Sequence, residues 1–172
     1  VGRFAQAYPN VTLEVTCALS KDLLSTSGRL RYDLILALHD DPFSAGSSLV
    51  KEDRLVWVGG TDNDVHLNTT VSLIVAPEGC IYRKRGKETL QKNLKDWRIV
   101  YTIPDLTGIQ AAINEGLGIT VLAKSTVPKN LRVLKNSEKL PELGKVGISL
   151  ISQSKDPGEA ITRLIEFVKA SL

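Results

Sequence analysis

The sequence predicts an α/β fold in which two βαβ-type lobes are joined by a hinge of two chain crossings. Segments typical of strands alternate along the chain with segments whose apolar residues recur at helical spacing. Residues 33–38 are almost continuously apolar, as expected of a strand buried on both faces of a parallel sheet. A chain of 172 residues is also long enough to form two small lobes.

The first lobe is expected to begin with the end of an amphipathic helix at residues 2–8. Apolar and polar residues then alternate over residues 11–16, which predicts a strand. Ser20 follows as the expected N-cap of a short helix. Two further strands of this lobe are predicted at residues 33–38 and 54–60, before a polar stretch that marks the lobe boundary.

The second lobe is expected to have the order βαβαβ, with Thr107 near the start of its second helix. A last strand and an amphipathic helix remain after this unit, and we expect them to return to the first lobe. The predicted lobes are residues 1–60 with 134–172, and residues 61–133. The later strands are placed at 71–76, 97–102, 118–122 and 146–152, and the later helices at 80–93, 106–115 and after 158.

Composition and charge exclude several classes of protein. Lys and Arg are scattered among 19 acidic residues and give a net charge of only +3, which does not indicate a nucleic-acid surface. No apolar run approaches the roughly 20 residues of a membrane span, so we expect a soluble protein. Cys17 and Cys80 fit neither a paired-cysteine metal motif nor a disulfide-rich secreted scaffold, and they favour a reducing cytoplasm. Both are more often inert hydrophobes than thiolate sensors.

No catalytic or cofactor-binding pattern is found in the sequence. The nucleophile elbow, the Walker loop and the zinc-protease helix motif are all missing, and Gly59 and Gly60 lack the remainder of a dinucleotide fingerprint. His39 and His66 are isolated from each other and from any cysteine, so a metal site is not expected. Because Val1 is not an initiator Met, the sequence is interpreted as a fragment. We therefore expect no catalytic residues, metal or cofactor.

Several short motifs occur in an order and spacing that are more specific than any one of them. The first helix ends in F-x-x-x-Y-P at residues 4–9, and Asp33 and Leu34 begin the buried strand. In the second lobe the corresponding runs are residues 77–83, 97–99, 108–122 and 127–128. Together these motifs resemble the substrate-binding domain of LysR-type transcriptional regulators, which has the fold of a type 2 periplasmic binding protein.

The resemblance covers essentially all 172 residues, with two departures. The family's first strand is expected to precede Val1, together with a loop that contributes polar ligand contacts. Leu30 stands where the family has a glycine.

Ligands in open α/β sheets bind at the carboxyl ends of strands, where helix N-termini present N–H groups. This rule selects residues 17–20 in the first lobe and residues 77–82 and 102–107 in the second. The resemblance implies that these loops face the cleft between the lobes, where one ligand can bias the lobe orientation. The candidate ligand-binding residues are Cys17, Ser20, Glu78, Gly79, Cys80, Tyr82, Thr102, Asp105 and Thr107.

Most of these side chains also have an ordinary structural explanation. Ser20 and Thr107 are N-caps first, and either could touch a ligand as well. Tyr82 and Arg83 either pack and pair on a helix surface or reach an acidic effector. His39 follows a buried strand and could approach the cleft.

The sequence therefore predicts the effector-sensing domain of a bacterial LysR-type regulator. A small molecule would bind in the cleft and control a winged helix-turn-helix in an N-terminal domain, through which alone DNA would be bound. The resemblance also implies a homodimer or tetramer in the cytoplasm, with the helix ending near Tyr8 against residues 106–115 of a second copy, and no membrane partner. The alternatives are a secreted solute-binding protein, which a leader peptide would favour, and an enzyme on the same fold, which lacks a reacting group.

Overall fold

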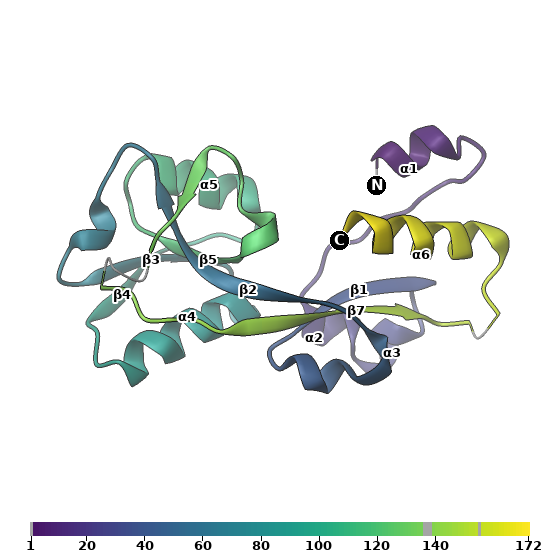
Figure 1. Ribbon diagram of the computed structural model, residues 1–172, viewed down its shortest axis with the longest axis horizontal. Helices are drawn as coiled ribbons and strands as arrows, with labels where there is room; N and C mark the ends of the chain where they lie inside the picture. The colour runs from purple at the N-terminus through teal and green to yellow at the C-terminus, as the bar shows by residue number, and fades with distance from the viewer. Residues whose placement is uncertain (1, 136–138, 155) are drawn as a thin grey trace. The chain divides into compact units, whose positions relative to one another are not determined.

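The computed structural model describes residues 2–135, 139–154 and 156–172. The chain divides into two compact units, which we call unit 1 (Val1–Lys51 and Gly147–Leu172) and unit 2 (Glu52–Val146). Two long strands, β2 (Leu49–Gly60) and β7 (Lys145–Ser152), each run from one unit into the other (Figure 1). The sequence placed the lobe boundaries at residues 60 and 134, whereas this division falls inside the two strands.

Unit 1 contains a pair of antiparallel strands and helices from both ends of the chain. Strand β1 (Leu34–His39) pairs with β7, and Leu36 lies opposite Leu150. Phe4 is fully buried, with its ring 4.7 Å from that of Tyr8 and 5.6 Å from that of Phe167 in the last helix. The helices are α1 (Gly2–Ala7), α2 (Ser20–Leu23), α3 (Thr26–Arg29), η1 (Pro42–Ser48) and α6 (Glu159–Ser171).

Two expectations for unit 1 are wrong. Residues 11–16 form no strand, because no described strand pairs with this segment and alternation alone cannot supply a hydrogen-bonding partner. Strand β1 is antiparallel to its one described neighbour and is not buried on both faces, since Leu36 is 48% exposed. A continuous apolar run therefore did not distinguish a central parallel strand from a strand at the end of the described sheet.

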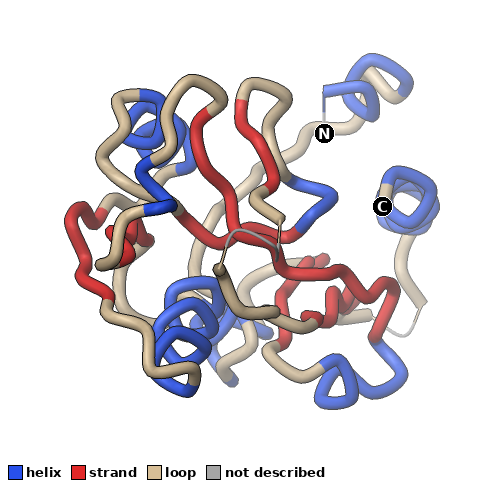
Figure 2. Tube along the Cα trace, turned by 60° about the vertical axis from the view of Figure 1, so that its left-hand side comes forward, coloured by secondary structure: helices blue, strands red, loops and turns tan. Residues whose placement is uncertain are grey.

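Unit 2 has the predicted order βαβαβ, and α4 and α5 lie on opposite sides of its strands (Figures 1 and 2). Strands β3 and β4 are parallel, and a single bridge from Leu73 to Ile119 joins β3 to the segment before β5. Strand β2 pairs antiparallel with β5 and β6. The bounds are η2 (Val65–Leu67), β3 (Val71–Val75), α4 (Ile81–Lys92), β4 (Trp97–Thr102), α5 (Leu106–Asn114), β5 (Thr120–Ala123), η3 (Lys124–Thr126) and β6 (Leu131–Val133).

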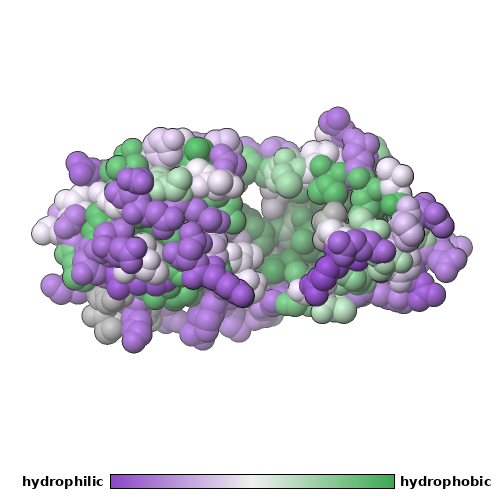
Figure 3. Space-filling view, turned by 90° about the horizontal axis from the view of Figure 1, so that it is seen from above, coloured by the Kyte–Doolittle hydropathy of each residue, from purple (hydrophilic) through white to green (hydrophobic). Residues whose placement is uncertain are grey.

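The core of unit 2 uses the apolar stripe of α5. Ile109, Ala112 and Ile113 pack with residues of the strands, among them Val58 and Ile74. This stripe is therefore buried in the core of unit 2. Hydrophilic residues cover most of the face of unit 2 seen at the left of Figure 3.

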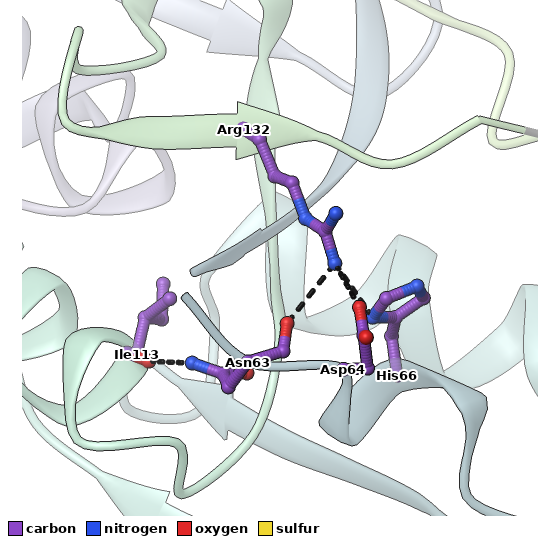
Figure 4. Close-up of polar contacts among 5 residues, drawn as sticks. All are labelled: Asn63, Asp64, His66, Ile113 and Arg132. Atoms are coloured by element: carbon purple, nitrogen blue, oxygen red, sulfur yellow. Dashed lines mark hydrogen bonds and ion pairs between the residues drawn. The ribbon is translucent and has the colours of Figure 1, made fainter. Parts of the chain in front are cut away.

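The connection from β2 to β3 is fastened to β6 by one arginine (Figure 4). Arg132 Nη2 donates to the Asn63 carbonyl at 3.0 Å, lies 2.6 Å from Asp64 Oδ1 and lies 3.5 Å from Nδ1 of the buried His66. The Asn63 side chain donates to the Ile113 carbonyl at 3.2 Å, near the end of α5. This connection is therefore tied to two elements that lie far from it in the sequence.

Among the described residues, no group of three or more His, Cys, Asp or Glu side chains could hold a metal ion.

His39, which the sequence left as a possible cleft residue, crosslinks three elements of unit 1. Its Nε2 lies 2.8 Å from Oγ of the fully buried Ser149 on β7, and its Nδ1 lies 3.2 Å from Ser44 Oγ in η1. Ser44 Oγ donates to the Asp41 carbonyl, so Nδ1 of His39 is the donor in its contact with Ser44 Oγ. Burial, and then the nearby charge of Arg29, lower the pKa of His39 below its ordinary value of 6.5.

Gly118 is expected to tolerate no side chain. A Cβ there would lie 2.3 Å from the Ser72 carbonyl oxygen, a backbone atom that cannot move away alone. Gly118→Ala should therefore lower the free energy of unfolding by about 1–3 kcal/mol, as overpacking does. Gly2→Ala is the control, because nothing lies within 4 Å of its added Cβ. Urea unfolding of both variants measures the difference, and equal stabilities would contradict the contact.

The lowered pKa of His39 predicts a stability that depends on pH. The unfolded chain protonates this ring near pH 6.5, whereas the folded chain protonates it only at lower pH. The free energy of unfolding should therefore be highest above pH 6.5 and decrease as the pH falls toward the folded-state pKa. Urea titrations of the wild type and His39→Gln between pH 7.5 and 5 test this, because the variant should lose part of the decrease. An identical pH profile for both proteins would show that His39 is not its source.

Candidate functional site

The carboxyl ends of β3 and β4 meet at one edge of unit 2, and two of the three predicted ligand segments begin there. Val75 lies opposite Thr102 in the parallel register, and the Ile103 N–H donates to the Val75 carbonyl at 3.0 Å. The loops that lead into α4 and α5 therefore start side by side. We call residues 76–80 and 103–107 the carboxyl edge.

The loop before α4 leaves the first turn of this helix without a side-chain cap. Gly79 has φ +94°, in the left-handed region that favours glycine. Cys80 is the N-cap residue, but its side chain makes no capping hydrogen bond, and the first turn contains no acidic residue. The first N–H groups of a helix lack partners within the helix and carry partial positive charge, so this turn favours an acceptor group.

Glu78 is mostly exposed and is held by two cations of α4. Arg83 Nη2 contacts its carboxylate, and Lys87 Nζ lies 3.6 Å from it. Arg83 Nη1 also donates to the Ala76 carbonyl at 3.1 Å. The negative charge of Glu78 is thus compensated within the chain.

Tyr82 faces inward and packs against the core of unit 2. Burial, followed by the nearby Cys80 and Asp53, raises the pKa of Tyr82 to about 12, so this phenol stays protonated at neutral pH. A cavity of about 30 Å³ lies beside it and is also lined by Ala76 and Arg83. That volume suits one or two water molecules and is too small for an organic effector.

Asp53 is a buried carboxylate that the sequence interpretation missed. It is 8% exposed, and it accepts hydrogen bonds from Ser125 Oγ at 2.5 Å and from the Arg54 N–H at 2.8 Å. Ser125 follows β5, which pairs with β2, and the two residues are far apart in the sequence. No local pattern could have indicated this contact.

The loop before α5 is capped, in contrast to the loop before α4. Asp105 is the N-cap, and its carboxylate accepts from the Gly108 N–H at 2.8 Å. The prediction that Thr107 caps this helix is wrong, because Asp105 occupies that position with extended backbone angles. Thr102 and Thr107 are both exposed on the described surface.

The third predicted segment lies in unit 1. The prediction that Ser20 is an N-cap is wrong, because Leu19 holds that position and α2 begins with Ser20. The Ser20 hydroxyl accepts from the Leu38 N–H at 2.9 Å, which fixes it near the carboxyl end of β1. Cys17 is an exposed free thiol, and Cys80 is a partly buried one. Convergence of this segment with the carboxyl edge on one ligand stays a prediction.

A wider groove of about 760 Å³ lies elsewhere in unit 2. Its lining comes from the later turns of α4 and from residues 142–144, and it mixes cations such as Arg85 and Lys92 with Glu88 and Glu142. The carboxyl edge is at the first turn of α4, so this groove is separate from the strand ends. No described helix is long and apolar enough to cross a membrane.

Known proteins match most or all of the chain. The family model described as LysR substrate binding domain matches residues 1–172. The HTH-type transcriptional regulator DgdR of Burkholderia cepacia is 24% identical over 171 residues, which are 99% of this chain and 58% of DgdR. The HTH-type transcriptional regulator PecT of Dickeya dadantii is 26% identical over 141 residues, which are 82% of this chain and 44% of PecT. The chain spans about half the length of these relatives.

Solved structures show the same fold. The regulatory domain of CcmR from Synechocystis PCC6803, in complex with 2-PG, has a TM-score of 0.67 at 16% identity and covers 99% of this chain and 88% of that domain. A regulatory domain of HypT from Salmonella typhimurium has a TM-score of 0.72 at 13% identity, covering 98% and 89%. These similarities confirm the predicted α/β fold of the periplasmic-binding-protein type. The matched relatives are transcriptional regulators rather than enzymes, and the chain belongs to the LysR substrate-binding domain family.

Proposed function

We propose that this chain senses a small organic effector for a LysR-type regulator and binds it at the carboxyl edge. The observation that carries this proposal is the pairing of two parallel strand ends with the uncapped first turn of α4. Such an edge is where α/β proteins bind ligands. The complex of the CcmR regulatory domain with 2-PG supports small-molecule binding by this fold.

The effector acts, in this proposal, by contacting both units. Ser20 of unit 1 would contact the same molecule as the carboxyl edge of unit 2. A ligand that touches both units shifts the equilibrium between two relative orientations of the units only if it binds one orientation more tightly than the other. The two strands that cross between the units, β2 and β7, would transmit that shift.

The remaining parts of the proposal concern the whole protein. Its relatives are HTH-type regulators, so we assign DNA binding to a helix-turn-helix outside this chain and a cytoplasmic location to the protein. The same relatives favour a regulator over a secreted solute-binding protein or an enzyme. A leader peptide upstream of Val1 in the full gene would reverse that choice.

Effector binding is tested by thermal shift with a metabolite panel. A compound at about 100 times its dissociation constant should stabilise the fold by roughly 2.7 kcal/mol. Ser20→Ala and, separately, Thr107→Val should each reduce that shift. Ser20→Ala removes the acceptor of the Leu38 N–H, so it also lowers the unliganded melting temperature, whereas the exposed Thr107 is not a cap and its replacement should not.

The matched control is Thr162→Val on α6, whose hydroxyl bonds only to the Pro157 carbonyl among the contacts described. A hit whose thermal shift survives both site substitutions unchanged would place the effector elsewhere. The wide groove beside α4 is the next place to test in that case.

We also propose that the chain forms a homodimer or a tetramer, with α1 of one copy against α5 of another. The buried stripe of α5 is not available for this contact, but Ala111 and the partly exposed Leu106 are. Sedimentation equilibrium should show dimers at micromolar concentration. Ala111→Arg should shift the population toward monomer without lowering the melting temperature of the monomer. A wild type that stays monomeric at high micromolar concentration would contradict the proposal.

A further inference from the structure

We infer that Arg83 is the positioning residue of the carboxyl edge. Arg83 holds the loop from Ala76 to Cys80 in a conformation that leaves the first N–H groups of α4 accessible to an effector. It also compensates the negative charge of Glu78. The inference rests on the proposed function of this edge. Its test, however, measures the loop itself and needs no effector.

Arg83 bonds both ends of a three-residue segment. Its Nη1 donates to the Ala76 carbonyl at 3.1 Å, directly after β3, and its Nη2 pairs with the Glu78 carboxylate. The side chain is 12% exposed although it starts in the first turn of α4. Its guanidinium therefore lies beneath the loop and ties that loop back to the helix it introduces.

A lysine would not replace this arginine. The planar guanidinium offers several N–H donors in fixed directions, whereas an ammonium group acts as a compact point charge. Lys87 shows the difference, because its Nζ lies 3.6 Å from the Glu78 carboxylate and no contact with Ala76 is described for it. Lys87 thus contributes charge, and Arg83 contributes both charge and geometry.

The geometry decides which effector group the edge accepts. Gly79 turns the chain with φ +94°, and the turn leads directly to the uncapped first N–H groups of α4. Without the Arg83 contact, only Lys87 would restrain the Glu78 carboxylate, and that carboxylate would compete with an acceptor on the effector for those N–H groups. We therefore assign to Arg83 the preference of this edge for a ligand bearing a carboxylate, phosphate or carbonyl group.

The test is amide hydrogen exchange of the whole chain, followed by NMR. Two amides report on the loop, because the Cys80 N–H donates to the Pro77 carbonyl at 3.3 Å and the Lys84 N–H donates to the Cys80 carbonyl at 3.0 Å. In Arg83→Lys both should exchange about tenfold faster, because a charged hydrogen bond and the Ala76 contact are lost. The Ile74 amide, which donates to the Ile119 carbonyl in the core, should keep its wild-type rate.

Two further variants separate positioning from charge and from general destabilisation. Glu78→Gln removes the exposed partner only and should accelerate the Cys80 amide severalfold, even if Arg83 variants fold poorly. Lys87→Met removes the second cation and should leave the Cys80 rate within about twofold of the wild type. Acceleration that is equal at Cys80 and Ile74, or Arg83→Lys rates equal to the wild type, would overturn the inference.

The outcomes also distinguish this inference from the proposed function. Suppose that loop exchange is faster in Arg83→Lys and Glu78→Gln, but no effector produces a thermal shift in the wild type. This result would establish the positioning role of Arg83 and refute the sensing role. Loop exchange at the wild-type rate in both variants, together with effector binding by the wild type, would support the proposed function and refute the positioning role of Arg83.

Discussion

Parallel pairing of β3 with β4 is the constraint on which the candidate site depends. Parallel strands require a crossover, and α4 supplies it, so the carboxyl ends of both strands reach the same edge of unit 2. The Leu73 to Ile119 bridge and the close approach of Gly118 to Ser72 hold the segment before β5 against β3. The positions of the two loops of the carboxyl edge are therefore set by β3, β4 and the segment before β5, and not by the sequences of the loops themselves.

The two helices that begin at this edge, α4 and α5, differ in the capping of their first turns. Asp105 satisfies the start of α5 with its own carboxylate, whereas Cys80 provides no such bond to α4. The acidic residue that most closely precedes α4, Glu78, contacts Arg83 and lies near Lys87 instead. One helix start is thus closed by the chain, and the other stays open to an external acceptor.

Unit 1 depends on polar contacts to a greater degree than its sequence indicated. Ser20 bonds to the backbone of β1, and His39 connects β1 with Ser149 of β7 and Ser44 of η1. Both contacts lie at the carboxyl end of β1. They fix the segment of unit 1 that the sequence predicts as ligand-binding and explain why Ser20 is not available as a helix cap.

The sequence by itself determined the positions of β4, α4 and α5, the order βαβαβ of unit 2, and the family. It also indicated the loops of the carboxyl edge, because strand ends follow from the strands. Only the tertiary structure decided which residue caps each helix, that β1 is antiparallel, and that Asp53 meets Ser125. The physical reason is that periodicity is a local property of the sequence. Strand pairing and the partner of a buried polar group depend instead on residues that are far apart in the chain.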